Sequence, residues 1–256
     1  MLRAAIPGPA ACRAFPGSPY DRRVVTEGRP LVIAIDGPAS SGKSSVGAAV
    51  AARLGYRFLD TGLLYRALTW LALGRGIDPA DGPTVAALVP EVDLEPDELG
   101  RLTRVFVDGR EVVTEIQTAA VERRVPEIAR QPVVRAALLP RQREYAAGGG
   151  IVLAGRDIGT VVLPGADRKV WLDASTEARA ARRAKERGHA PGSPAAARIL
   201  ADLRRRDATD TGRATAPARP APDAAIVVTD SLDLEQTVDA VLAIVGGTRP
   251  AGKGRR

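Results

Sequence analysis

A glycine-rich segment near residue 40 carries the clearest chemical signal in this sequence. Residues 37–44 read Gly-Pro-Ala-Ser-Ser-Gly-Lys-Ser, which fits the phosphate-binding pattern G-x-x-x-x-G-K-[ST] at every fixed position. Small residues let backbone N–H groups curl around a polyphosphate, and a helix beginning near Lys43 would add its positive N-terminal end. Lys43 would reach the β- and γ-phosphates, and the Ser44 hydroxyl would bind Mg²⁺. The segment therefore predicts a polyphosphate site.

Two other segments place polar residues directly after apolar runs. In the first, Asp60-Thr61-Gly62 enters a predicted helix, and Thr61 can cap that helix and donate to a phosphate. Arg66 lies five residues after Thr61, and its long side chain can reach back toward the end of the preceding strand. The alternative interpretation is a capped helix with a surface arginine.

In the second segment, Gly155-Arg156-Asp157-Ile158-Gly159-Thr160 follows a buried apolar run. Arg156 can hold a phosphate with two parallel hydrogen bonds. Asp157 can accept a hydrogen bond from an amino group on a base. The alternative is that these charges form an ion pair within the molecule.

Arginines are also dense on both sides of a Gly/Pro-rich stretch at residues 187–194, which we expect to be a mobile loop. In a phosphotransferase such a face neutralises the charge that develops on the transferred group. The alternative is a solvated helix with ion pairs along its surface. The residues concerned are Arg179, Arg182, Arg183, Arg206, Asp210 and Arg213.

These residues need a scaffold, and the apolar pattern predicts one. Short apolar runs alternate with helical patterns, which indicates an α/β fold with a doubly wound, five-stranded parallel sheet. Ligands bind such sheets at the carboxyl ends of the strands. The predicted strands are Leu31–Ile35, Arg57–Leu59, Ile151–Leu153, Lys169–Leu172 and Ala225–Val228. The predicted helices are Lys43–Leu54, Gly62–Leu73, Glu115–Arg130, Val133–Ala147, Glu177–Lys185, Ala195–Arg206 and Leu234–Val245.

One segment breaks this alternation, at about residues 88–117. Val92–Leu94, Val105–Val107 and Val112–Val113 resemble three short strands, with a turn at Asp108-Gly109. They predict a small antiparallel insertion in a single domain that spans residues 30–248.

Charge and composition narrow the class of protein. The first 29 residues carry a formal charge of +3 and the last eight carry +4, which accounts for the whole net charge of +7. We expect both ends to be disordered, solubilising tails, with no specific nucleic-acid binding by the neutral domain. A single cysteine, the lack of a secretory pattern and the lack of a membrane-length apolar run predict a cytoplasmic protein.

Taken together and in this order, the motifs resemble those of the bacterial cytidylate kinases, which are nucleoside monophosphate kinases with a P-loop. The resemblance covers roughly residues 31–246, including Leu172-Asp173-Ala174-Ser175 and Arg206-Asp207 followed by Asp210 and Arg213. It implies transfer of the γ-phosphoryl group of ATP to CMP and dCMP by a monomer, with Mg²⁺. It also implies that the insertion belongs to the monophosphate site and that residues 182–213 form a short lid.

The resemblance implies a role for each matching residue. Thr61, Arg66 and Arg156 would serve the phosphate of CMP, and Arg135 and Asp157 would contact the cytosine ring. Arg206 and Asp210 would hold the pentose. Lys43, Arg182, Arg183 and Arg213 would supply catalytic positive charge. The ATP phosphates would bind to Gly37, Pro38, Ala39, Ser40, Ser41, Gly42, Lys43, Ser44 and Ser45.

The sequence departs from the family pattern at three positions. Ala154 stands where the family often has an acidic residue near Mg²⁺, and Asp36 is the expected substitute. Pro126 replaces a serine near the base, and Gln117 replaces an arginine. Two other functions remain open from the sequence, a kinase for another acceptor such as UMP and a regulatory ATPase that binds nucleic acid through the tails.

Overall fold

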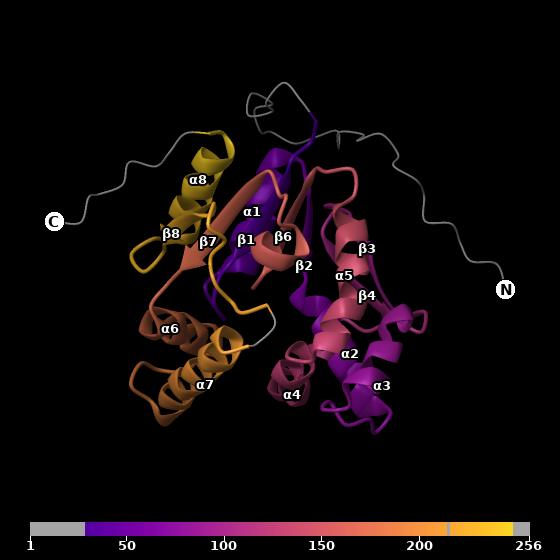
Figure 1. Cartoon of the computed structure of the whole chain (residues 1–256). Helices are drawn as coiled ribbons and strands as arrows, with labels where there is room; N and C mark the ends of the chain where they lie inside the picture. Colours follow the sequence, from indigo (N-terminus) through magenta and orange to yellow (C-terminus); the bar gives the residue numbers. More distant parts are fainter. Residues whose placement is uncertain (1–28, 214–215, 248–256) are drawn as a thin grey trace.

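A five-stranded parallel sheet forms the core of the molecule. The computed structural model describes residues 29–213 and 216–247, and the sheet order is β2-β6-β1-β7-β8 (Figure 1). The predicted doubly wound α/β fold is confirmed. The strands are β1 (Val32–Asp36), β2 (Arg57–Asp60), β6 (Ile151–Gly155), β7 (Arg168–Asp173) and β8 (Ala225–Val228).

The two predicted tails lie outside the described residues, apart from Arg29, whose guanidinium lies 2.5 Å from a carboxylate oxygen of Asp167. Among the helices described, none is both long enough and apolar enough to cross a membrane.

Helices cover both faces of the sheet because successive residues of each strand point to opposite sides. On β1, Ile33 and Ile35 are buried against α1 (Lys43–Leu54) and α8 (Leu234–Val245). Ala34 faces the other way, into the larger core that is completed by three other helices. These helices are α2 (Gly62–Gly74), α4 (Ala119–Ala129) and α5 (Pro132–Ala146).

The carboxyl ends of the strands meet at one edge, because the sheet is parallel. Asp36 of β1 is in register with Gly155 of β6, and Asp60 of β2 is in register with Ala154. Beyond this edge lies a pair of packed helices, α6 (Thr176–Glu186) and α7 (Pro194–Thr211). Figure 1 shows α4 between this pair and α2, so the edge is bordered by helices from distant parts of the chain.

The antiparallel insertion is confirmed, but its third strand begins two residues earlier than predicted. It consists of β3 (Val92–Pro96), β4 (Leu102–Val107) and β5 (Arg110–Glu111). Asp108 and Gly109 both have positive φ angles, 49° and 74°. A two-residue turn of this type starts the pairing at the next residue, which is why β5 begins at Arg110 and not at Val112.

The predicted helix 115–130 was wrong at its start. Residues Glu115–Gln117 form a short 3₁₀ helix, and Thr118 then caps α4 by accepting a hydrogen bond from the Val121 N–H. A threonine side chain that satisfies an open helix end starts a new helix there. The prediction also lacked α3 (Gly82–Ala87), which Asp81 caps and in which Pro83 occupies the first turn, where proline is tolerated. Helix α7 runs five residues beyond its predicted end.

Gly47 of α1 marks the closest approach between that helix and the sheet. A Cβ atom at this position would lie 2.5 Å from Cε2 of Phe58, a buried residue of β2. We therefore expect Gly47→Ala to be destabilising by about 1–3 kcal/mol through overpacking, which lowers the melting temperature by about 2–10 °C. The matched control is Gly74→Ala in α2, where a Cβ atom meets nothing within 4 Å and alanine favours the helix. Equal melting temperatures for the two variants would contradict this packing.

Candidate active site

The glycine-rich segment forms a loop that only glycine can make at two positions. Gly37 has a φ of 157°, and a Cβ atom there would lie 2.3 Å from the Leu172 carbonyl oxygen. Gly42 has a φ of 90° and precedes α1 without a side-chain cap. The first turn of α1 contains no acidic residue. The N-terminal end of α1 therefore carries no side-chain anion of its own in its first turn, which is the geometry that favours a bound anion.

Lys43 is buried within this loop. Its ammonium group donates to the Pro38 carbonyl at 2.5 Å and to the Ser41 hydroxyl at 3.3 Å. Burial, and then the positive charge of Arg156, lower the pKa of Lys43 well below its ordinary value. A nearby phosphate would raise the pKa of Lys43 again, since an opposite charge favours the ammonium form.

Ser44 contacts a carboxylate that the sequence analysis had not assigned to the metal. Its hydroxyl donates to Oδ2 of Asp60, the last residue of β2, at 2.5 Å. Hydroxyl and carboxylate oxygens are ligands that suit Mg²⁺, which is usually held by one or two protein oxygens together with substrate phosphates. These two residues fit the ion. The position of Asp60 at the end of a predicted strand could have indicated a metal-binding role from the sequence alone.

Asp36, the substitute expected from the sequence, is used differently. Its two carboxylate oxygens accept hydrogen bonds from the Ile158 and Gly159 N–H groups at 2.8 and 2.7 Å. The side chain is 5% exposed, and burial raises its pKa to about 6, against the effect of those two hydrogen bonds. Asp36 therefore anchors the π-helical turn at Ile158–Val162 to β1.

Thr61 does not cap α2 with its side chain, which corrects that prediction. Its hydroxyl donates to the Ala154 carbonyl oxygen at 3.0 Å and is buried between β2 and β6. The hydroxyl therefore ties two neighbouring strand ends together where the site begins.

Arg156 and Asp157 pair with residues from other elements. Asp157 forms a buried ion pair with Arg135 of α5, whose guanidinium also lies 5.8 Å from the ring centre of Tyr65. Arg156 donates to Asp210 of α7 at 3.1 Å. Both residues therefore form ion pairs within the molecule, as the alternative interpretation expected, but each pairs with a different element.

The end of α7 adds two more cations. Arg213 pairs with Asp210, and burial lowers the pKa of Arg213 although Asp210 opposes the shift. Burial, and then the charge of Arg156, lower the pKa of Arg206 to about 10. The Nε atoms of Arg206 and Arg213 are buried and find no acceptor within the described residues. Unsatisfied buried donors beside other cations favour an anionic ligand.

The arginines of α6 divide into three roles. Arg179 is buried, and it pairs with Asp207 of α7 at 2.6 Å and donates to the Ala39 carbonyl. It therefore joins the two helices to the P-loop and does not form the open cationic face that its spacing indicated. Arg182 points to Thr229, whose hydroxyl and carbonyl oxygens both accept from it.

Arg183 reaches the P-loop through the Ser40 hydroxyl at 2.9 Å and also pairs with Glu122 of α4. Burial, and then the charges of Arg187 and Arg66, lower its pKa. Of the two lid arginines in the prediction, Arg183 is the one that this structure brings to the phosphate loop. Arg66 likewise has a pKa lowered by burial.

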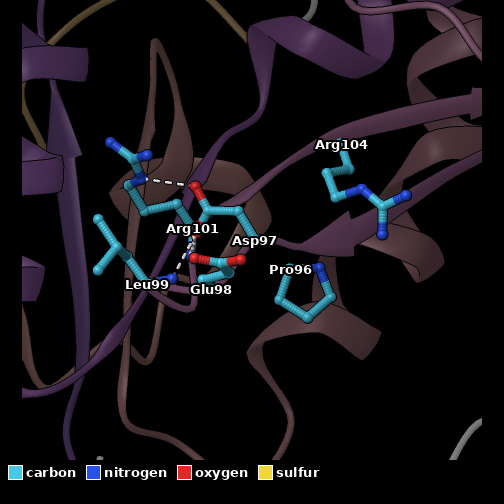
Figure 2. Close-up of a pocket in the computed structure, with 6 residues that line it drawn as sticks. All are labelled: Pro96, Asp97, Glu98, Leu99, Arg101 and Arg104. Carbon is cyan, nitrogen blue, oxygen red and sulfur yellow. Dashed lines mark hydrogen bonds and ion pairs between the residues drawn. The ribbon is translucent and has the colours of Figure 1, made fainter.

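A surface hollow of about 500 Å³ lies elsewhere, on the β3–β4 hairpin. Figure 2 shows Asp97 and Arg101 paired with each other at one side and Arg104 standing apart from them. The lining residues are Pro96, Asp97, Glu98, Leu99, Arg101 and Arg104. None of them belongs to the predicted site, and the charges of Asp97 and Arg101 neutralise each other. The hollow therefore does not coincide with the site that the sequence predicts at the strand ends.

Comparison with known proteins gives a consistent result. A family model described as cytidylate kinase matches residues 33–246. The cytidylate kinase of Pelotomaculum thermopropionicum is 44% identical over 222 residues, which cover 85% of this chain and 96% of that protein. The cytidylate kinase of Nocardia farcinica is 42% identical over 222 residues, 86% of this chain and 96% of that protein.

A bifunctional pantoate ligase/cytidylate kinase from a Synechocystis species is 45% identical over 240 residues. These residues are 91% of this chain but 46% of that protein. The chain therefore spans about half the length of this bifunctional relative.

The raised pKa of Asp36 predicts a pH dependence of stability. The folded protein holds the Asp36 proton up to about pH 6, whereas the unfolded chain releases it near its ordinary pKa of 3.8. Between these values the folded state binds more protons, so its stability falls as the pH rises. We expect the unfolding free energy of the wild type, relative to Asp36→Asn, to fall by about 2–3 kcal/mol between about pH 4 and pH 7. Denaturant titrations across this range measure the difference, and a pH-independent difference would contradict the assignment.

Proposed function

The chain belongs to the cytidylate kinase family, and on that premise we propose that it transfers the γ-phosphoryl group of ATP to CMP and dCMP, giving ADP and CDP or dCDP. The observation that carries the proposal is the buried Arg135–Asp157 ion pair, directly beside the phosphate-binding candidate Arg156. The Arg135–Asp157 pair would contact the base, and it lies next to the cationic cluster that would bind the phosphates.

The Arg135–Asp157 pair is complementary to cytosine. A carboxylate accepts from the exocyclic amine of the base, and a guanidinium donates to the neighbouring ring nitrogen. Uracil presents a carbonyl and an N–H at these positions, so both contacts would meet a like group. An unpaired buried polar group costs about 1–3 kcal/mol, and Tyr65 beside Arg135 limits the access of water that could relieve it.

Phosphoryl transfer needs the two phosphates held together and their charge neutralised. The P-loop N–H groups and Lys43 serve the ATP phosphates. Arg66 and Arg156 serve the phosphate of CMP. The family resemblance assigns Arg206 to the pentose, but its neighbours Arg156 and Arg66 favour a phosphate oxygen in this structure. The acceptor phosphate is already ionised near neutral pH, so we assign no residue as a general base.

The remaining groups position and shield the reactants. Ser44 and Asp60 would hold Mg²⁺, which withdraws charge from the phosphates when bound. Asp210 lies between Arg156 and Arg213, where Arg156 and Arg213 lower its pKa against the opposing effect of burial. It therefore stays ionised, can accept from the pentose hydroxyls and orients both arginines. Arg183 links α6 to the P-loop, which places helical cover over the phosphates and excludes water.

We further propose that the enzyme works as a monomer in the cytoplasm and needs no membrane or nucleic acid. The formal neutrality of residues 30–248 supports the absence of nucleic-acid binding. Light scattering measures the mass of the protein alone and with DNA or RNA. A dimeric mass would contradict the monomer, and a stable complex would contradict the absence of nucleic-acid binding.

An ADP-release assay with CMP, dCMP, UMP and AMP tests the reaction and the base-reading pair together. We expect turnover with CMP and dCMP, and a kcat/KM for CMP that is about tenfold to a hundredfold lower in Asp157→Ala. The kcat/KM for UMP should change much less, because uracil does not use the carboxylate. The matched control is Asp223→Asn, which removes a carboxylate from an exposed ion pair with Lys169. Equal turnover of UMP and CMP by the wild type would refute the base assignment, and no acceptor-dependent ADP release would refute the kinase.

A further inference from the structure

One carboxylate of α4 lies among arginines from two other helices. Glu122 is in the first turn of α4, and its side chain is 20% exposed. It pairs with Arg183 of α6 and accepts from Arg187 of the same segment at 2.7 Å. Its Oε1 also lies 3.9 Å from Nη2 of Arg66 on α2. Glu122 therefore connects three helices that are far apart in the sequence.

Two of these arginines have roles in the proposed reaction. Arg66 is assigned to the phosphate of CMP, and Arg183 touches the P-loop through Ser40. Burial lowers the pKa values of both, and the positive charges of Arg187 and then Arg66 add to the shift of Arg183. Two partly buried guanidinium groups this close favour an anion beside them, and Glu122 is that anion in this structure.

A carboxylate and a phosphate bind to guanidinium in the same way. Each presents oxygens to the forked N–H groups, with one or two charge-assisted hydrogen bonds. Glu122 forms ion pairs with Arg66 and Arg183 through Oε1, which accepts no hydrogen bond within the described residues. A substrate phosphate that binds these arginines would experience like-charge repulsion from this carboxylate. The two anions therefore compete for the same positive charge.

We propose that Glu122 is a positioning residue that takes the place of the substrate phosphate, holding Arg66 and Arg183 between α2, α4 and α6 until a nucleotide displaces it. The proposal rests on the function proposed above. It predicts that Glu122 weakens binding of the phosphate while it keeps both arginines ordered. A permanent structural bridge would have the opposite effect on binding, since its loss would disorder the arginines.

Binding of CMP to Glu122→Gln distinguishes these roles. The glutamine keeps the shape and an acceptor oxygen but removes the charge. We expect the Kd for CMP, measured by calorimetry, to fall about threefold to tenfold, since the partly exposed ion pairs that compete with the phosphate are individually weak. The Kd for cytidine, which has no phosphate, should not change. The KM for CMP should fall with the Kd, whereas kcat should not rise.

Glu127→Gln is the matched control. It removes a carboxylate from the same helix, where Glu127 pairs with Arg124 at 3.3 Å, and it should leave both Kd values unchanged. A second variant, Arg187→Gln, removes a partner that competes with Arg66 and Arg183 for Glu122. We expect it to weaken CMP binding, because Glu122 is then free to hold the other two arginines more tightly.

Inorganic pyrophosphate separates this proposal from the function it rests on, because it needs the arginines but no base pocket. Tighter pyrophosphate binding by Glu122→Gln supports the role of Glu122 even where CMP is not turned over. Unchanged or weaker binding of both CMP and pyrophosphate by Glu122→Gln would overturn it. So would an equal gain in affinity for cytidine, since that gain would not involve the phosphate.

Discussion

Positive charge is crowded into the carboxyl edge of the sheet, and the arrangement of the surrounding helices depends on how that charge is balanced. Burial lowers the pKa values of Lys43 and Arg206, and neighbouring cations add to both shifts. Arg156 contributes to each of them. Buried cationic side chains lower the stability of the folded protein unless an anion lies beside them. A cluster of cations with lowered pKa values is therefore typical of sites that bind anions. The polyphosphate and the monophosphate would supply the missing negative charge, which links the fold directly to the reaction.

Without nucleotides, carboxylates from several elements provide part of the balance. Asp157 pairs with Arg135, Asp210 pairs with Arg156, and Glu122 joins α4 to α6. These pairs connect the end of β6 with α5 and α7, and α4 with α6, across the site. In the proposed function, the base and the pentose would offer donors to Asp157 and Asp210, whereas the phosphate would compete with Glu122 for its arginines. The same ion pairs therefore stabilise the site and influence how tightly ligands bind.

Local features were predictable from the sequence, and features that depend on tertiary approach were not. The P-loop, α1 and the antiparallel insertion follow from glycine positions, apolar periodicity and turn residues, all within short segments. The family resemblance is confirmed by the comparisons. The contact of Asp60 with Ser44 and the three arginines around Glu122 arise only when distant helices and strands meet, so no spacing indicates them. Thr118 was missed for a different reason: a helical pattern continues through it, and its capping side chain decides the break.

The central claim is that this edge transfers a phosphoryl group between two nucleotides and keeps water away from it. The most direct measurement follows ATP that is labelled with radioactive phosphorus in its γ-phosphate, incubated with the enzyme, Mg²⁺ and CMP. The account predicts that the label appears in CDP, with little in inorganic phosphate and none in CDP when the enzyme is omitted. Label that appears only in inorganic phosphate, whether or not CMP is present, would show hydrolysis and contradict the account.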